Sequence, residues 1–254
     1  MELKDFFSQN PKVAVAFSGG VDSAFLLYAA KKYAKEVRSY YVRSQFQPRF
    51  EYEDAVRFAN EIGVSLSVID VNVLSDSKVC TNPPDRCYFC KKVIFSSIIK
   101  RASEDGFSVL LDGTNASDSV SERPGMRALE ELRVLSPLRE CGLTKKEIRE
   151  RSRLAGLFTW NKASYACLAT RIPTDCAINK ERLECTERAE EFLRQIGFSN
   201  FRVRMIVAQE KQIAKIQVQK NQIQLLVENR EKILGKFKED YDSVLFDLET
   251  RDEQ

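Results

Sequence analysis

Histidine is absent from all 254 residues of this chain. Its absence excludes the imidazole that most often acts as general base or as neutral metal ligand, and leaves carboxylates, lysines and thiolates for any chemistry. The chain also lacks an apolar run near the roughly 18 residues that a membrane span needs, and its first residues include acids but no apolar core of a signal peptide. We therefore expect a cytoplasmic protein that does not enter a membrane.

An excess of charge of one sign is lacking too. The net charge is only +3, which gives no indication of wholesale binding to nucleic acid or to membranes. With 43% hydrophobic and 30% charged residues, the composition is that of an ordinary globular protein with one large domain or two smaller ones. Seven cysteines, an odd number in a chain without a secretion signal, favour thiol or metal chemistry over a disulfide framework.

The most informative segment spans residues 13–23, where an apolar run is interrupted by Ser-Gly-Gly-Val-Asp-Ser and then continues as a helical pattern. The pattern predicts a strand, a loop and a helix. Gly19 and Gly20 let backbone N–H groups converge, Ser18 and Ser23 add hydroxyls, and the helix directs its positive end there, so the segment is suited to bind a phosphate. No Gly-Lys-Ser/Thr follows and a third glycine is missing, which excludes the kinase-type P-loop and the dinucleotide fingerprint. A plain tight turn is the alternative, but it would not require these polar residues.

Beyond this loop, strand-like runs alternate with helical patterns, which indicates a parallel sheet. Ligands of such sheets bind at the carboxyl ends of strands, where both the loop at 18–23 and Asp-Gly-Thr-Asn at 112–115 fall. The strand-like runs are 37–42, 65–71 and 109–112, and the helical patterns are 52–61 and 88–104.

The second half of the chain has a different pattern. A helix with a capping box begins at Thr144, and residues 159–174, which contain the only tryptophan, lose all periodicity, as expected at a junction between domains. We predict an α/β fold: a Rossmann-like parallel sheet over 1–160 and a smaller α+β domain over 161–254. The elements predicted in the latter are helices at 179–196 and 221–237 and strands at 201–207, 214–218 and 243–246.

The cysteines fall into groups with different possible chemistry. Cys87 and Cys90 form a single Cys-x-x-Cys, which fits half a zinc site, a redox dithiol or two packing residues. Cys167, Cys176 and Cys185 follow at equal intervals of nine. Three thiolates could hold an iron–sulfur cluster by three corners and leave one iron open, whereas buried inert thiols are the alternative.

Positive charge collects around the later cysteines. Arg171 follows Cys167, and Arg202 and Arg204 alternate on a predicted strand, so that both point to one face. Paired guanidinium groups would bind a phosphate or carboxylate and would lower the pKa of a nearby thiol. A solvated strand face is the alternative.

Six motifs spread over most of the chain resemble, in order, those of the LarE family within the PP-loop ATP pyrophosphatase superfamily. They are SGGVDS at 18–23, NPPDRCYFCK at 82–91, DGTN at 112–115, RPG at 123–125, SPL at 136–138 and CLATRIP at 167–173. The resemblance implies an ATP-dependent sulfur transferase of nickel-pincer cofactor synthesis, which adenylates a carboxylate of a dicarboxylated pyridinium mononucleotide and then replaces an oxygen by sulfur. It implies ATP and Mg2+ as cofactors, Asp22 near the metal, a nucleotide substrate and a homo-oligomer. The ATP-binding residues it implies are Ser18, Gly19, Gly20, Val21, Asp22, Ser23, Gly113 and Asn115.

The resemblance also implies two possible sources of sulfur. In one branch of the family the residue matching Cys167 gives up its own sulfur and becomes dehydroalanine, whereas in another three cysteines bind a 4Fe-4S cluster that carries an extra sulfide. Cys176 and Cys185 make this chain resemble the cluster branch, which would take sulfide or another sulfur donor. The residues implied to hold the substrate phosphate or carboxylate are Arg171, Arg202 and Arg204.

The chain departs from the family at two places and leaves two other functions open. Ser117 stands in place of one of the family's two adjacent aspartates, and Gln217 replaces a glutamate, which leaves room for a related but different acceptor. A cluster-dependent tRNA thiolase is one alternative, although no basic surface is evident. A module that senses ATP without turning it over is the other, and pyrophosphate release would exclude it.

Overall fold

The computed structural model describes residues 1–118, 124–209 and 211–251. The chain divides into two compact units. Unit 1 comprises Met1–Val73 and Asp85–Lys162, and unit 2 comprises Leu74–Pro84 and the chain from Ala163 onward. The prediction placed a single boundary at residue 160 and did not foresee that Leu74–Pro84 belongs to unit 2.

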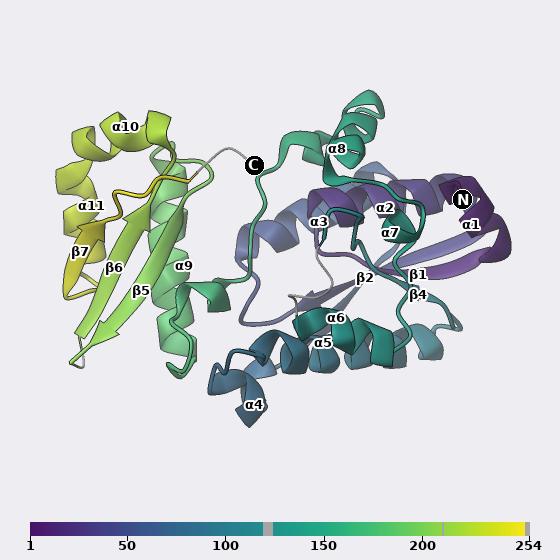
Figure 1. The fold of residues 1–254 in the computed structure, drawn as a ribbon, viewed down its shortest axis with the longest axis horizontal. Coiled ribbons are helices and arrows are strands. Elements are labelled where there is room, and N and C mark those ends of the chain that lie inside the picture. Colours follow the sequence, from purple (N-terminus) through teal and green to yellow (C-terminus); the bar gives the residue numbers. More distant parts are fainter. Residues whose placement is uncertain (119–123, 210, 252–254) are drawn as a thin grey trace. The chain divides into compact units, whose positions relative to one another are not determined.

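Unit 1 is built on a four-stranded sheet in which all paired strands are parallel, with the order β3-β2-β1-β4 (Figure 1). The predicted Rossmann-like α/β fold is therefore confirmed. Because β2 lies on one side of β1 and β4 on the other, the order of strands reverses at β1, and such a switch point is where sheets of this class bind ligands. The strands are β1 (Lys12–Ala16), β2 (Glu36–Arg43), β3 (Leu66–Asp70) and β4 (Leu110–Leu111).

Helices cover both faces of this sheet. Alternate strand residues point to opposite faces, and here both sets are apolar and buried. Val13 and Val15 join one hydrophobic core, whereas Ala14 between them joins the other. The first face is covered by α1 (Leu3–Gln9), α2 (Val21–Tyr33), α3 (Arg49–Glu61), α7 (Pro137–Glu140) and α8 (Lys145–Leu154), and the second by α5 (Arg86–Glu104) and α6 (Pro124–Glu131) (Figure 1). Arg123 of the RPG motif lies outside the described residues.

Unit 2 has a three-stranded sheet in the order β5-β6-β7, in which β5 pairs antiparallel with β6 and β6 pairs parallel with β7. Its core joins two helices, α9 (Lys180–Gln195) and α11 (Arg230–Phe237), to the sheet, and includes Leu193 of α9, Val203 of β5 and Phe237 of α11. The helix predicted over 221–237 is interrupted at Asn229, where α10 ends and α11 begins. The elements are α9 (Lys180–Gln195), β5 (Arg202–Ala208), β6 (Lys211–Gln217), α10 (Ile223–Glu228), α11 (Arg230–Phe237) and β7 (Ser243–Phe246).

Several short helices complete the units: η1 (Val73–Ser75), α4 (Ser77–Cys80), η2 (Phe158–Asn161), η3 (Leu168–Arg171) and η4 (Lys220–Gln222). The segment with α4 is tied to unit 2 through Asn82, which is 2% exposed. Its side-chain amide donates to the carbonyl of Pro173 at 2.7 Å, and its carbonyl accepts from the backbone of Asp175 at 2.9 Å. No helix of the described residues is long and apolar enough to cross a membrane.

Candidate functional site

The segment around the loop at 18–23 forms the strand, turn and helix that the sequence predicts: β1 ends at Ala16 and α2 begins at Val21. Gly19 has a φ of +76°, a left-handed conformation that favours glycine, and Gly20 is the N-cap of α2. The hydroxyls of Ser18 and Ser23 lie 3.1 Å apart, and the Ser23 hydroxyl donates to the carbonyl of Gly20 at 3.2 Å. The loop is thus closed on itself beside the first turn of α2, whose leading N–H groups have no acceptor within the helix and are suited to an anion.

The segment after β4 packs directly against this helix start. A Cβ atom at Gly113 would lie 2.9 Å from the backbone nitrogen and 3.1 Å from the Cα of Ser23, so only glycine fits. Asp112 is buried and accepts hydrogen bonds from the hydroxyls of Thr114 and Ser136, each at 2.5 Å. These bonds fix the turn that brings Gly113 to α2.

Asn115, which the resemblance assigns to ATP binding, forms hydrogen bonds with two residues of its own loop. It is 3% exposed, and its side-chain oxygen accepts the backbone N–H of Ser117 at 2.8 Å, while its own N–H donates to Asp118 at 3.0 Å. The geometry therefore gives Asn115 a role in shaping the loop.

Asp22 lies in the first turn of α2 and has two different carboxylate oxygens. Oδ2 accepts from the ammonium of Lys145 at 2.6 Å. Oδ1 is buried and has no hydrogen-bond partner among the described residues. Carboxylate oxygens are the ligands that Mg2+ prefers, and an unsatisfied buried oxygen beside a phosphate-binding loop fits such a metal.

A second lysine supports the loop from the end of unit 1. The ammonium of Lys162 donates to the carbonyl of Gly19 at 3.2 Å and pairs with Asp54 at 2.6 Å. Neither Lys145 nor Lys162 was singled out in the sequence, because a lysine on a helix or in a loop gives no local signal of a partner more than a hundred residues away.

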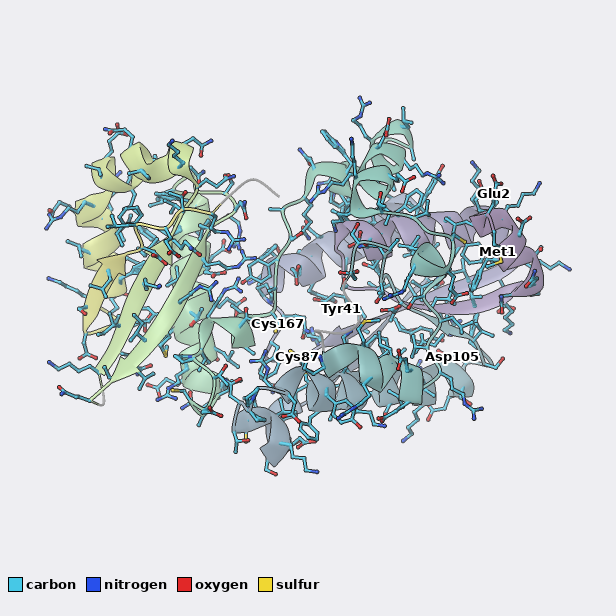
Figure 2. All side chains as sticks on the ribbon, in the orientation of Figure 1. Met1, Glu2, Tyr41, Cys87, Asp105 and Cys167 are labelled. Carbon is cyan, nitrogen blue, oxygen red and sulfur yellow. The ribbon has the colours of Figure 1, made fainter. Side chains whose placement is uncertain are left out.

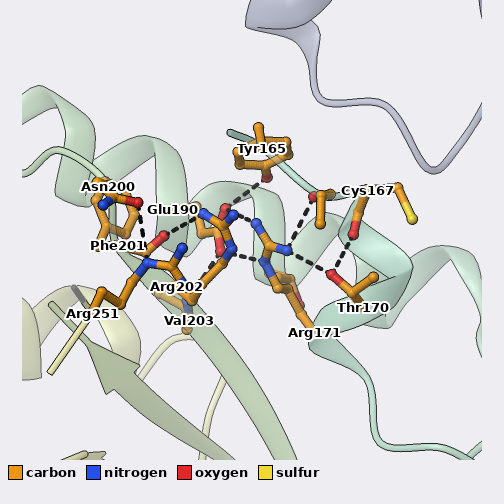
Figure 3. A network of polar contacts seen from close by, with 12 residues as sticks. Tyr165, Cys167, Thr170, Arg171, Glu190, Asn200, Phe201, Arg202, Val203 and Arg251 are labelled. Atoms are coloured by element: carbon orange, nitrogen blue, oxygen red, sulfur yellow. Dashed lines mark hydrogen bonds and ion pairs between the residues drawn. The ribbon is translucent and has the colours of Figure 1, made fainter. Parts of the chain in front are cut away.

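Cys167 of unit 2 precedes η3 and is held by a network of polar contacts (Figure 3). Its carbonyl accepts from the backbone and the hydroxyl of Thr170, at 3.0 and 2.8 Å. That hydroxyl accepts from the guanidinium of Arg171 at 2.7 Å, and the same guanidinium nitrogen donates to the carbonyl of Ala166 at 3.0 Å. The backbone on both sides of Cys167 is therefore fixed by Arg171.

Arg171 is 2% exposed, and its other two nitrogens bind Glu190 at 2.7 and 3.2 Å. Burial would lower the pKa of Arg171, but the carboxylate of Glu190 outweighs it, and the pKa is raised. Glu190 also accepts from the hydroxyl of Tyr165 at 2.6 Å and the backbone of Val203 at 3.0 Å. With all three nitrogens occupied, Arg171 holds the Cys167 segment, and the prediction that it binds substrate does not fit this geometry.

Arg202 and Arg204 alternate along β5, and they differ in exposure. Arg202 is 7% exposed and donates to two backbone carbonyls, whereas Arg204 is exposed. Burial, together with the positive charges of Arg171 and Arg251, lowers the pKa of Arg202 to about 10. Arg251, bound to Asn200, was not foreseen as a member of this group (Figure 3). Several arginines around one buried glutamate form a positive region suited to an anion.

The three later cysteines do not gather into a metal site. Cys185 is 4% exposed within the hydrophobic core of unit 2, where burial, followed by the charge of Asp240, raises its pKa to about 11. Among the described residues, which include Cys167 and Cys176, no group of three histidine, cysteine or acidic side chains could hold a metal ion. The predicted set of Cys167, Cys176 and Cys185 therefore does not fit a 4Fe-4S cluster, since Cys185 points into the core.

The Cys-x-x-Cys pair begins α5 of unit 1. Cys87, labelled in Figure 2, lies in the first turn of this helix with an exposed side chain. Its sulfur accepts from the guanidinium of Arg86 at 3.5 Å. Cys90 is half-buried one turn further along the helix. No group of three metal-ligating side chains forms among the described residues, so the structure gives no support to half a zinc site, and a redox dithiol or two packing residues remain as the alternatives.

Comparisons with known proteins place the chain in a family. The family model of the queuosine biosynthesis protein QueC matches residues 12–81, which include the phosphate-binding loop. The pyridinium-3,5-bisthiocarboxylic acid mononucleotide synthase of Lactiplantibacillus plantarum is 31% identical over 195 residues, covering 76% of this chain and 71% of that protein. The chain belongs to the LarE family.

Two further relatives mark the breadth of the similarity. An uncharacterised protein of Synechocystis is 34% identical over 229 residues, covering 89% of this chain and 84% of that protein. The tRNA-specific 2-thiouridylase MnmA of Thermotoga petrophila is 27% identical over 143 residues, 47% of this chain and 40% of that protein. The similarity to the LarE synthase thus extends over much more of the chain than the similarity to the tRNA enzyme.

Proposed function

We propose that this chain is an ATP-dependent sulfur transferase that acts on the carboxylates of a dicarboxylated pyridinium mononucleotide. The observation that carries the proposal is the closed glycine loop at the switch point of the sheet, in a chain that belongs to the LarE family. Unit 1 would activate the carboxylate, and unit 2 would supply the sulfur.

Activation by unit 1 is an adenylation. A carboxylate oxygen of the substrate attacks the α-phosphorus of ATP, an acyl–oxygen–phosphorus bond forms, and the bond to the β-phosphate breaks to release pyrophosphate. The N–H groups at the start of α2, with Ser18 and Ser23, stabilise the charge that develops on the pyrophosphate. Asp22 would hold Mg2+ through its unpartnered oxygen, and the metal when bound neutralises phosphate charge.

Sulfur delivery is assigned to Cys167. Its thiolate attacks the acyl adenylate, a thioester forms and AMP leaves with the electron pair of the broken bond. Removal of the Cα proton of Cys167 by a base then breaks the Cβ–Sγ bond, which leaves a thiocarboxylate on the product and dehydroalanine in the chain. The network around Arg171 holds the backbone of Cys167 for these steps. No step passes through an iron–sulfur cluster, because Cys185 is buried in the core.

The acceptor would be held by its negative groups. Arg202 and Arg204 are the residues we assign to the substrate phosphate or to its second carboxylate. Support comes from the lowered pKa of Arg202, since a buried guanidinium next to other arginines gains most from an added anion.

The test supplies the purified chain with Mg2+, ATP and the pyridinium dicarboxylate mononucleotide, and measures pyrophosphate and the mass of the protein. We expect one pyrophosphate per carboxylate activated, and a decrease in the mass of residue 167 equal to one molecule of hydrogen sulfide. Cys167→Ala should keep the release of pyrophosphate and lose the transfer of sulfur, whereas the control Cys176→Ala should keep both. Pyrophosphate release without loss of sulfur from wild-type Cys167 would refute this sulfur source.

The same assay separates the alternatives. The MnmA similarity makes tRNA the competing acceptor, and sulfur found in added tRNA, with none in the mononucleotide, would replace the proposed substrate. Binding of ATP with no pyrophosphate for either acceptor would indicate a sensor and refute the proposal.

A further inference from the structure

Lys145 is the first residue of α8, and its ammonium lies against the phosphate-binding loop. It is 2.6 Å from Oδ2 of Asp22, which belongs to the first turn of α2. The other oxygen of the same carboxylate is buried and without a hydrogen-bond partner in the described part of the chain. One ion pair thus joins the starts of two helices and satisfies only half of the carboxylate.

The backbone of Lys145 is fixed more firmly than its side chain. Its N–H donates to the hydroxyl of Ser117 at 3.0 Å, and the neighbouring Thr144 forms a capping box with Glu147. The side chain itself is 30% exposed. A lysine held at its backbone, with four methylenes leading to a partly exposed ammonium, can change partners without a change in the fold.

Bound ATP would create an electrostatic conflict at this place. The polyphosphate would lie beside the carboxylate of Asp22, and like charges repel unless a cation lies between them. In the ligand-free protein, the cation paired with Asp22 is Lys145. A divalent metal held by Oδ1 would place a second positive charge beside the ammonium on Oδ2, and repulsion between the two cations would displace the lysine toward the phosphates.

Lys162 is less suited to this change of partner. Its ammonium pairs with Asp54 and donates to the carbonyl of Gly19, and its side chain is only 15% exposed. These contacts hold the loop in place, and they would be lost if the ammonium moved.

We propose that Lys145 is a switching cation of the ATP site, which neutralises Asp22 in the ligand-free protein and moves to the polyphosphate when a divalent cation takes the carboxylate. This inference rests on the proposed function, because it assumes that the loop binds ATP. It assigns a nucleotide-binding role to a residue outside the glycine loop.

The first experiment uses Mn2+ alone. Titration of the ligand-free protein, followed by electron paramagnetic resonance, is compared for wild type, Lys145→Gln and the control Lys146→Gln, whose side chain is exposed. Since a partly exposed ion pair is worth about 1 kcal/mol or less, loss of the competing ammonium should tighten Mn2+ binding about two- to fivefold. Asp22→Asn added to Lys145→Gln should abolish this gain in Mn2+ affinity, because the carboxylate that binds the metal is then absent. Unchanged or weaker Mn2+ binding in Lys145→Gln would overturn the competition.

The second experiment measures binding of the α,β-methylene analogue of ATP with Mg2+ by calorimetry. Loss of a charge-assisted hydrogen bond to phosphate should weaken binding about tenfold or more in Lys145→Gln, and Lys145→Arg should restore most of it. Equal affinities for wild type, Lys146→Gln and Lys145→Gln would refute the switching role while ATP binding stands. Absence of binding to wild type would refute the proposed function itself.

Discussion

Replacement of Glu190 by glutamine tests the polar network that holds the Cys167 segment. The carboxylate is 1% exposed and accepts four hydrogen bonds, two of them from the buried Arg171. Glutamine has nearly the same shape but no charge, so the variant leaves Arg171 charged, buried and uncompensated. Removal of one partner of a buried ion pair lowers the free energy of unfolding by about 3–5 kcal/mol.

The effect should be measurable by urea unfolding followed with circular dichroism. About 3–5 kcal/mol corresponds to a fall of roughly 6–20 °C in Tm for a chain of this size. The matched control is Glu191→Gln in the same helix, where a half-exposed pair with Arg194 is lost and the change should stay within about 0.5 kcal/mol. The rate at which iodoacetamide alkylates Cys167 should rise in Glu190→Gln only, because Arg171 no longer fixes its backbone.

A double variant identifies the physical cause. If the uncompensated charge is responsible, Arg171→Met combined with Glu190→Gln should recover part of the stability that Glu190→Gln loses. A Glu190→Gln variant within about 1 kcal/mol of wild type, or a double variant with no recovery, would refute the assignment of charge as the cause.

Two other changes have defined outcomes. Gly113→Ala places a Cβ 2.9 Å from the backbone nitrogen of Ser23, so we expect lower stability and weaker ATP binding by calorimetry. The control is Gly235→Ala, in a helix where an added Cβ would meet no atom within 4 Å, and it should raise stability by about 0.5–1 kcal/mol. Equal behaviour of the two variants would show that the close approach of Gly113 to Ser23 is unimportant. The pKa of Cys185 is raised to about 11 from 9, so its neutral thiol stabilises the fold below pH 9. This contribution to the free energy of unfolding, at most about 2.7 kcal/mol, is lost as the pH rises through 11. Cys185→Ser should lack this loss, and an identical fall in stability at alkaline pH in the variant and the wild type would contradict it.

The sequence predicted the parts of the fold that depend on local patterns. The strand, loop and helix around Gly19 follow from neighbouring residues. The capping box at Thr144 also forms as expected, and the helix predicted over 179–196 is observed over Lys180–Gln195. Short helices such as α4 and α7 were missed, because four residues are too few to show a helical period.

Long-range pairing explains why part of the candidate site was missed. Lys145 binds a carboxylate 123 residues away, and Glu190 is one of several acidic residues along α9 without a local mark of burial. For Cys185 a signal was available: with Ala189 and Leu193 it occupies one helical face at spacings of four, which is typical of a core position. The equal spacing of the three cysteines in sequence carried no information about their distance in space.

The excursion of Leu74–Pro84 into unit 2 has a consequence for how the chain is made. Synthesis completes unit 1 before most of unit 2 exists, so this segment cannot form its hydrogen bonds until Ile172–Ile178 have been added. Only then can the side-chain amide of Asn82 donate to the carbonyls at 172 and 173, and the carbonyl of Cys80 accept from the backbone N–H of Ile178. A fragment that begins at Ala163 would lack the buried amide of Asn82, and a fragment that stops at Lys162 would expose it. The two units therefore cannot be expressed intact as consecutive halves, and a separate unit 2 would need residues 74–84 joined to it by design.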